Sequence, residues 1–209
     1  SIFIREHYHL SPQLIVKQPS GKFKVIGQSN EQQKYYAWGF SKRFSYENSK
    51  GQPLRGALFY PAGYDATKSY PMVVHIYEHL SQYYNQYVNP TLQNEDGFNI
   101  SNLTTQGYFV LLPDIAYEEG KPGVSAVDCV TAAINEVLAH ESVDKMRIGL
   151  VGHSFGGYET NFIVTQTNLF AAAISGAGFA DSISCYLSVG DGNLKQETWR
   201  YEFNQLRMG

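Results

Sequence analysis

The distribution of apolar and polar positions changes along the chain and predicts several distinct strands. Residues 38–46 alternate aromatic with polar side chains, and residues 54–60 return as a second strand after a polar turn. Residues 70–77 have an apolar centre, and residues 108–113 are too uniformly apolar to face water. These segments predict an antiparallel pair followed by interior strands.

Helical patterns occur between and after the later strands. Residues 99–106 offer a short helix, and residues 125–128 resemble a capping box with Asp in place of the usual Glu. The apolar stripe of the helix that this box would open comprises Val127, Val130, Ile134 and Val137. Strands are predicted at 146–151 and 170–175, the second of them buried, with a helix at 158–166 between them. This order predicts an α/β fold with a mostly parallel sheet and helices on both faces.

Both ends of the chain depart from this pattern. In residues 1–35, two short strands are interrupted at Pro12 and at a later Pro-Ser-Gly, and residues 27–33 are polar and linker-like. We therefore expect residues 1–35 to stand apart from a domain at residues 36–209. The tail is mixed, and Gln196 to Leu206 could form an amphipathic helix.

Composition narrows the class of protein. A chain of 209 residues can bury one sizeable core, and 43% apolar with 17% charged residues is typical of a globular protein. The net charge of −3 gives no reason to expect nucleic acid or an anionic membrane as partner, and no apolar run reaches the roughly 18 residues of a membrane span. The first residues, SIFIRE, do not have the pattern of a signal peptide, and the chain does not begin with methionine. We therefore expect a processed or partial chain whose native location, periplasmic or secreted among others, stays open.

The two cysteines indicate no metal or redox motif. Cys129 and Cys185 are too few and too far apart for a zinc knuckle or a Cys-x-x-Cys pair. Cys129 falls on the predicted buried face of a helix, where it is expected to act as a small apolar residue. We therefore expect no cofactor.

Candidate chemistry centres on residues 151–157, VGHSFGG, where a predicted strand meets a predicted helix. Gly152 and Gly156 flank Ser154 at two positions on either side, and Gly157 adds a third small residue. Such spacing allows a sharp, strained bend that presents a serine hydroxyl at the N-terminus of a helix. We predict that Ser154 is a nucleophile on this elbow, with an ordinary glycine-rich turn as the alternative.

The order of these segments resembles the catalytic domain of the prolyl oligopeptidase family of serine peptidases. The resemblance covers roughly residues 38–179, and its most specific pieces are residues 54–61, residues 68–77 and the elbow. It implies an α/β-hydrolase fold that is preceded by a β-propeller. Residues 1–35 would then be the end of the propeller and a linker. Residues 36–209 would be a partial catalytic domain whose sheet is incomplete at its C-terminal edge.

The same resemblance implies an oxyanion hole. In this family, a tyrosine at the end of the third strand and the backbone N–H after the serine stabilise the oxyanion, and the matching residues are Tyr77 and Phe155. Tyr77 could instead be one more packed aromatic among sixteen tyrosines. Relatives often continue with Gly-Gly-Pro, whereas this chain has Glu78-His79-Leu80, so the shape of the loop is expected to differ.

The chain lacks a histidine after the elbow. In an α/β-hydrolase the acid and the base follow the nucleophile, but all six histidines come at or before residue 153. The acids beyond Ser154 are Glu159, Asp181, Asp191, Glu197 and Glu202. We expect the triad acid and base to lie outside this chain, which would leave it close to inactive alone. An alternative is that His79 reaches Ser154, whereas His153 and His75 are expected to be structural.

The remaining acids have simpler interpretations. Asp181 is expected to cap a helix, and Asp191 to lie in a turn. Asp114 could order the loop at residues 117–120 or be a solvated carboxylate, and Glu118-Glu119 is expected to be a surface pair.

Three functions remain open from the sequence. The leading one is a serine peptidase with an acyl-enzyme on Ser154, followed by a carboxylesterase or other acyl hydrolase, and then by a non-catalytic fragment or interaction domain. The expected partners are a peptide substrate and the remainder of its own chain, propeller included. Self-association through an exposed sheet edge at residues 170–175 is also expected.

Overall fold

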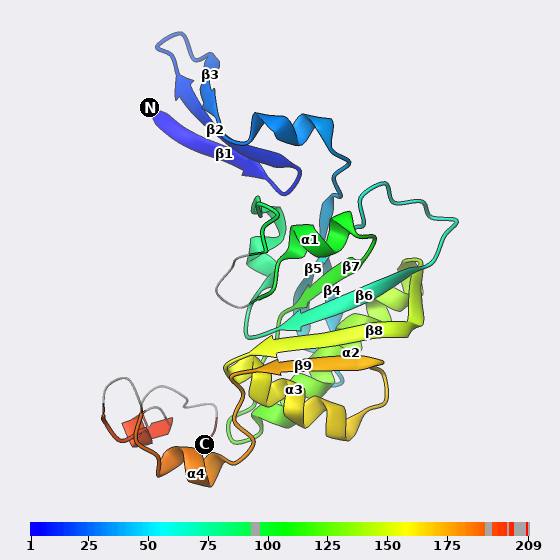
Figure 1. Ribbon diagram of the computed structural model, residues 1–209, viewed down its shortest axis with the longest axis vertical. Coiled ribbons are helices and arrows are strands. Elements are labelled where there is room, and N and C mark those ends of the chain that lie inside the picture. Colours follow the sequence, from blue (N-terminus) through cyan, green and yellow to red (C-terminus); the bar gives the residue numbers. More distant parts are fainter. Residues whose placement is uncertain (93–96, 191–193, 200, 203–207, 209) are drawn as a thin grey trace.

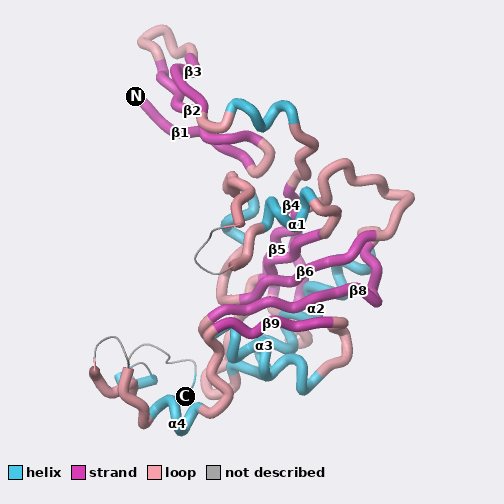
Figure 2. The backbone as a smooth tube through the Cα atoms, viewed as in Figure 1, coloured by secondary structure: helices cyan, strands magenta, loops and turns pink. Residues whose placement is uncertain are grey.

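The chain forms two separate β-sheets, joined by a helical turn (Figure 1). The computed structural model describes residues 1–92, 97–190, 194–199, 201, 202 and 208. A three-stranded sheet with the order β1-β2-β3 projects from one end of the molecule, and a six-stranded sheet with the order β4-β5-β7-β6-β8-β9 forms its body (Figure 2).

The projecting sheet contains one strand more than the sequence predicted. Antiparallel strands β1 (Ile2–His7), β2 (Leu10–Lys17) and β3 (Phe23–Gln28) precede a 3-10 helix, η1 (Glu31–Tyr35). Pro12 lies inside β2 and does not end it, because the β1–β2 pairing shifts register next to it and its carbonyl accepts from the N–H of Ser29. The assignment of residues 1–35 to a propeller stays a prediction.

The six-stranded sheet contains the predicted antiparallel pair and is parallel over its other half. β4 (Ser41–Glu47) pairs antiparallel with β5 (Pro53–Phe59), and β5 pairs antiparallel with β7 (Phe109–Pro113). From there the pairing is parallel, through β6 (Tyr70–Ile76) and β8 (Val143–His153) to β9 (Ala172–Gly176).

Alternate side chains of each inner strand enter two hydrophobic clusters on opposite faces of the sheet. Leu58 and Leu111 pack with α2 (Pro122–His140) and α3 (Phe155–Gln166), whereas Phe59 and Val110 face α1 (Ile100–Thr105). The sheet is therefore covered by helices on both faces, as predicted.

The helix α2 begins earlier than predicted. Pro122 occupies its first turn, where the missing N–H of proline costs nothing, and the box expected at residues 125–128 lies inside the helix. Ser125 instead donates its hydroxyl to the carbonyl of Lys121, at 2.9 Å. The predicted stripe is buried at Val130, Ile134 and Val137, and Val127 packs against it half-buried.

Strand β9 is exposed, contrary to the prediction of a buried strand. Ile174 is 64% exposed, and the preceding residues of this strand are exposed as well. Within the described residues, β9 pairs only with β8, so its other side lacks a neighbouring strand. Apolar side chains of β6, β8 and β9 line an open cavity of about 350 Å³ on this part of the sheet.

Several smaller expectations are confirmed. Cys129 is fully buried, and Asp181 caps α4 (Ser182–Tyr186) by accepting from the N–H groups of Ile183 and Ser184. Asp191 lies outside the described residues, as does part of the expected helix from Gln196 to Leu206. None of the helices in the described ranges is long and apolar enough to cross a membrane.

The contact between α2 and α3 depends on the absence of a side chain at Gly123. A Cβ atom on Gly123 would lie 2.6 Å from the ring of Phe162. Alanine normally stabilises a helix by about 1 kcal/mol relative to glycine, but overpacking costs roughly 1–3 kcal/mol.

We therefore expect Gly123→Ala to lower the free energy of unfolding, measured with urea. Gly123→Ala together with Phe162→Leu should lose less than the sum of the two single changes. A Gly123→Ala protein more stable than wild type would contradict this packing.

Candidate active site

Ser154 occupies the junction between β8, which ends at His153, and α3, which begins at Phe155. Its backbone has φ 58° and ψ −119°, a conformation that costs a non-glycine residue about 1–3 kcal/mol. Hydrogen bonds hold the bend: the N–H of Ser154 donates to the carbonyl of Gly176 in β9 at 2.8 Å, and its own carbonyl accepts from Gly157 at 2.9 Å. The serine is thus presented on a strained strand-to-helix turn, at the N-terminus of a twelve-residue helix.

Three glycines make this bend possible by letting backbone segments approach one another. A Cβ atom on Gly152 would lie 2.1 Å from the carbonyl oxygen of Gly156. One on Gly156 would lie 2.4 Å from that of Ile76, and one on Gly157 would lie 2.7 Å from that of Gly176. No Cβ atom fits at such distances, so the elbow is packed directly against the ends of β6 and β9.

The close approach at Gly156 brings Tyr77 beside the elbow. Tyr77 follows β6, and its ring carbon Cδ2 lies 3.5 Å from the position of a Cβ on Gly156. Phe155 is the first residue of α3, so its N–H lies in the first turn of the helix, next to Ser154. Tyr77, Ser154 and Phe155 therefore lie in one small region, and the role of Tyr77 and Phe155 in an oxyanion hole stays a prediction.

The loop after Tyr77 is fastened by the segment that follows β7. The carbonyl of Glu78 accepts from the N–H of Ile115 at 2.8 Å, and the buried carboxylate of Asp114 accepts from the N–H and hydroxyl of Ser81, at 2.8 and 2.6 Å. The expectations for Asp114 were wrong. It is not solvated, and it holds the start of η2 (Ser81–Asn85) rather than the loop at residues 117–120.

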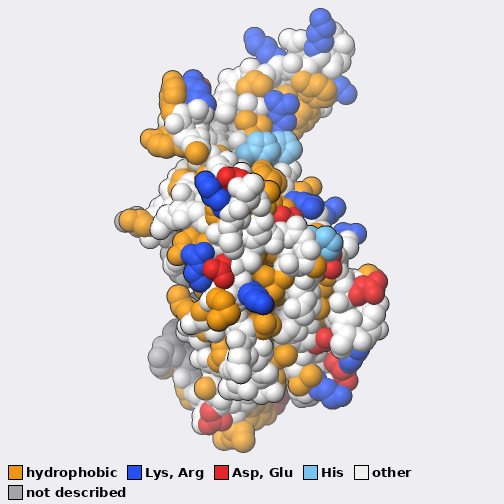
Figure 3. All heavy atoms as spheres, turned by 90° about the vertical axis from the view of Figure 1, so that its right-hand side faces the viewer, with side chains coloured by type: hydrophobic (Ala, Val, Ile, Leu, Met, Phe, Trp, Pro, Cys, Tyr) orange, Lys and Arg blue, Asp and Glu red, His pale blue; other side chains and the backbone are white. Residues whose placement is uncertain are grey.

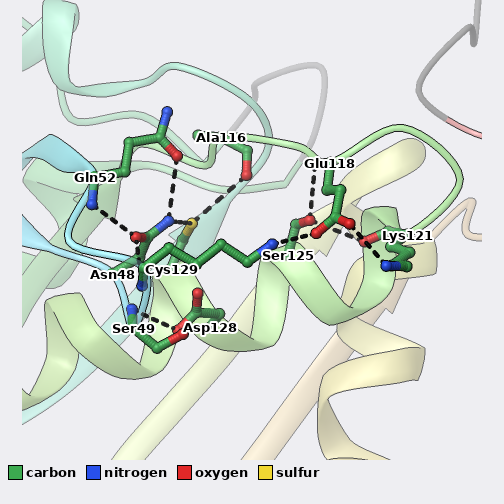
Figure 4. Close-up of polar contacts among 10 residues, drawn as sticks. Asn48, Ser49, Gln52, Ala116, Glu118, Lys121, Ser125, Asp128 and Cys129 are labelled. Atoms are coloured by element: carbon green, nitrogen blue, oxygen red, sulfur yellow. Dashed lines mark hydrogen bonds and ion pairs between the residues drawn. The ribbon is translucent and has the colours of Figure 1, made fainter.

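That loop is held by another network, in which side chains from three elements converge (Figure 4). The thiol of Cys129 donates to the carbonyl of Ala116 at 3.8 Å, and the N–H of Glu118 donates to the hydroxyl of Ser125 at 3.0 Å. The Glu118 carboxylate bonds Lys121 at 2.7 Å and also Lys50, from the turn between β4 and β5.

These two ammonium groups, that of Lys121 first, lower the pKa of Glu118 to about 2. The Glu118 carboxylate is therefore charged and paired with two lysines, whereas Glu119 is exposed. On the face shown in Figure 3, acidic and basic side chains are interspersed.

The loop presents Tyr117 to the interior. Its hydroxyl donates to the carbonyl of Tyr77 at 2.9 Å and also hydrogen-bonds Oε1 of Glu159 in α3. Glu159 is fully buried. Sequence reasoning did not single out Tyr117 and counted Glu159 only among the acids beyond the elbow, because no motif marks either residue.

A cavity of about 210 Å³ opens beside the serine. Phe179, which lines the cavity, stacks on Tyr158 with ring centroids 4.7 Å apart and forms a T-shaped contact with Tyr201. The residues that line the cavity are Ser154, Phe155, Ala177, Phe179, Cys185, Ser188, Glu197 and Tyr201. The lining thus combines aromatic rings with two serine hydroxyls, a thiol and the carboxylate of Glu197.

The histidines lie in different surroundings. His75, in the middle of β6, stacks on Phe98 with centroids 4.1 Å apart, in accord with a structural role. His153 ends β8 and is half-buried, and His79 is exposed on the loop after Tyr77. In the described part of the chain, no three side chains of the His, Cys, Asp or Glu type are grouped so that they could hold a metal ion.

Comparisons with known proteins agree with this geometry. The family model described as "Prolyl oligopeptidase family" matches residues 94–204, which is more than half of the chain. An uncharacterized peptidase of Bacillus subtilis, YuxL, is 29% identical over 155 residues, covering 68% of this chain and 22% of that protein. Mouse dipeptidyl peptidase 8 is 28% identical over 147 residues, covering 64% of this chain and 16% of the relative. The chain thus spans about a fifth of the length of these relatives or less.

Solved structures show the same fold at low sequence identity. Pyrococcus horikoshii acylaminoacyl peptidase gives a TM-score of 0.68 at 18% identity, over 88% of this chain and 30% of that one. The isopeptidase AtxE2 gives a TM-score of 0.65 at 19% identity, with the same coverage. The predicted α/β-hydrolase fold is therefore confirmed, and the chain belongs to the prolyl oligopeptidase family.

Proposed function

We propose that Ser154 is the nucleophile of a serine peptidase. The observation that carries this proposal is the backbone of Ser154, which has a positive φ at a bend where a helix begins. A strained conformation of this kind persists only where the surrounding contacts enforce it, and such positions cluster at active sites. The names of the similar proteins, peptidases and dipeptidyl peptidases, support peptide bonds as the substrate class.

The proposed reaction is acyl transfer in two steps. The Oγ of Ser154 forms a bond to the carbonyl carbon of the substrate, and its proton passes to a general base. The C–N bond then breaks, the amine leaves with a proton from that base, and an acyl-enzyme remains on the serine. Water then attacks the acyl carbon and gives a proton to the base. The bond from this carbon to Oγ breaks, Ser154 takes the proton from the base, and the acid product leaves.

Tyr77 and Phe155 are the proposed donors to the developing oxyanion. The hydroxyl of Tyr77 and the N–H of Phe155 would each stabilise charge that appears only in the transition state. The first turn of α3 adds the positive end of its helix dipole. The position of Tyr77 beside Gly156 supports this assignment, because it places the ring next to the same turn.

The acid and base of the triad are proposed to lie outside these 209 residues. The chain contains no histidine beyond Ser154, and it spans about a fifth of the relatives it resembles. Its partners would then be a peptide substrate and the rest of the natural polypeptide, including a propeller. A serine hydroxyl without a base is a poor nucleophile, so the chain alone should be close to inactive.

Labelling with a fluorophosphonate tests the nucleophile. In the full natural polypeptide we expect rapid labelling at Ser154 and none after Ser154→Ala, read by mass spectrometry of the labelled peptide. The 209-residue chain alone should hydrolyse an activated ester at a rate close to that of its Ser154→Ala variant. A full polypeptide that stays unlabelled, or brisk Ser154-dependent turnover by the chain alone, would contradict the proposal.

We infer that the chain on its own associates through β9. Its exposed edge carries Ile174, and an apolar strand edge without a neighbour is a template for pairing with another copy. Sedimentation at rising concentration should show dimers or larger species, and Ile174→Lys should shift them toward monomer. A monodisperse wild-type monomer at high concentration would show the inference to be wrong.

A further inference from the structure

Tyr117 contacts both residues that are proposed to stabilise the oxyanion. Its hydroxyl lies 2.9 Å from the carbonyl oxygen of Tyr77, and its ring packs edge-on against Phe155, with centroids 6.0 Å apart and planes at 85°. A change in the position of Tyr117 would therefore displace the backbone of Tyr77, whose side chain is one proposed donor. It would also displace Phe155, whose N–H is the other.

Glu159 holds the hydroxyl of Tyr117 from the other side. It lies four residues after Phe155 on α3, is fully buried, and its Oε1 forms the hydrogen bond to Tyr117. Tyr158 on the same helix and the thiol of Cys129 from α2 are among the titratable groups that sense its charge. Burial first, and then charges that include the Glu159 carboxylate, raise the pKa of both.

Burying a carboxyl group at this position lowers the stability of the fold. Transfer of a polar group to the interior without hydrogen bonds costs several kcal/mol, and an apolar side chain would fill the same space without that penalty. The bond to Tyr117 offsets part of this cost and fixes the phenol ring. The hydroxyl has one proton and two oxygen partners, so the Glu159 carboxyl group and the carbonyl of Tyr77 share a single donor.

We propose that Glu159 is a positioning residue for the oxyanion hole. It acts through the hydroxyl of Tyr117 on the carbonyl of Tyr77, and so sets the direction in which the Tyr77 side chain leaves the end of β6. This inference rests on the proposed function. The backbone of the Tyr117 loop is fastened independently, by Cys129, Ser125 and the lysine partners of Glu118, so a change at Glu159 should leave the loop in place.

The test uses the full natural polypeptide and a peptide amide as substrate. Glu159→Leu removes the bond to Tyr117, and we expect kcat to fall about tenfold or more with KM within about twofold, because the oxyanion forms only in the transition state. Glu159→Gln should stay within about threefold of wild type, since its amide can donate to the Tyr117 oxygen. Tyr117→Phe should resemble Glu159→Leu, and the double variant should be no worse than either single one.

Matched controls separate positioning from loss of fold. Ile163→Val removes one methylene from a fully buried residue of the same helix, and it should leave kcat unchanged. Fluorophosphonate titration counts the folded, reactive enzyme, so kcat is expressed per reactive serine. If Glu159→Leu does not fold, the comparison of Tyr117→Phe with Glu159→Gln decides.

This design distinguishes failure of the proposed function from failure of the positioning role. A wild-type enzyme that is not labelled at Ser154 would remove the proposed function itself. A labelled wild type whose kcat is unchanged by Tyr117→Phe and Glu159→Leu would overturn the positioning role alone. The positioning role would also fail if Glu159→Gln were as slow as Glu159→Leu, because a bond through the amide should have rescued the rate.

Discussion

The geometry of the site depends on the contact of three backbone segments around the elbow. The end of β6, the start of α3 and the end of β9 approach so closely that no side chain fits between them, as the positions of Gly156 and Gly157 demonstrate. This contact fixes the bend at Ser154 from both sides, and the hydrogen bond to Gly176 closes it. The cost of the unusual backbone, about 1–3 kcal/mol, is met by the packing of the surrounding strands.

The parallel order of the strands brings further residues to this contact and so forms a site. The carboxyl ends of β6, β8 and β9 meet at one edge of the sheet, and the groups that follow them are Tyr77, Ser154 and the segment leading to Phe179. Residues that are far apart in the chain thus lie around one bend. A second layer, formed by the segment after β7, fastens Tyr77 and the residues that follow it. Tyr117 bonds the carbonyl of Tyr77, Ile115 bonds that of Glu78, and Asp114 holds Ser81.

The part of this arrangement that could be predicted from the sequence is the part that follows from local spacing. Glycines at fixed offsets from Ser154 identify the elbow, and uniform apolar runs identify the inner strands, because both signals depend on neighbouring residues. The start of α2 was misplaced since Pro122 outweighs a weak capping pattern. The burial of β9 was misjudged because an apolar run does not reveal whether a neighbouring strand is present. Tyr117 and Glu159 meet only through the fold.

The most direct measurement is a crystal structure of the full polypeptide with a phosphonate bound to Ser154. We expect the phosphonyl oxygen to lie about 2.7–3.1 Å from both the hydroxyl of Tyr77 and the N–H of Phe155, with Ser154 retaining a positive φ. An adduct whose oxygen faces solvent, or a Ser154 that lies outside a tight bend between β8 and α3, would contradict the account.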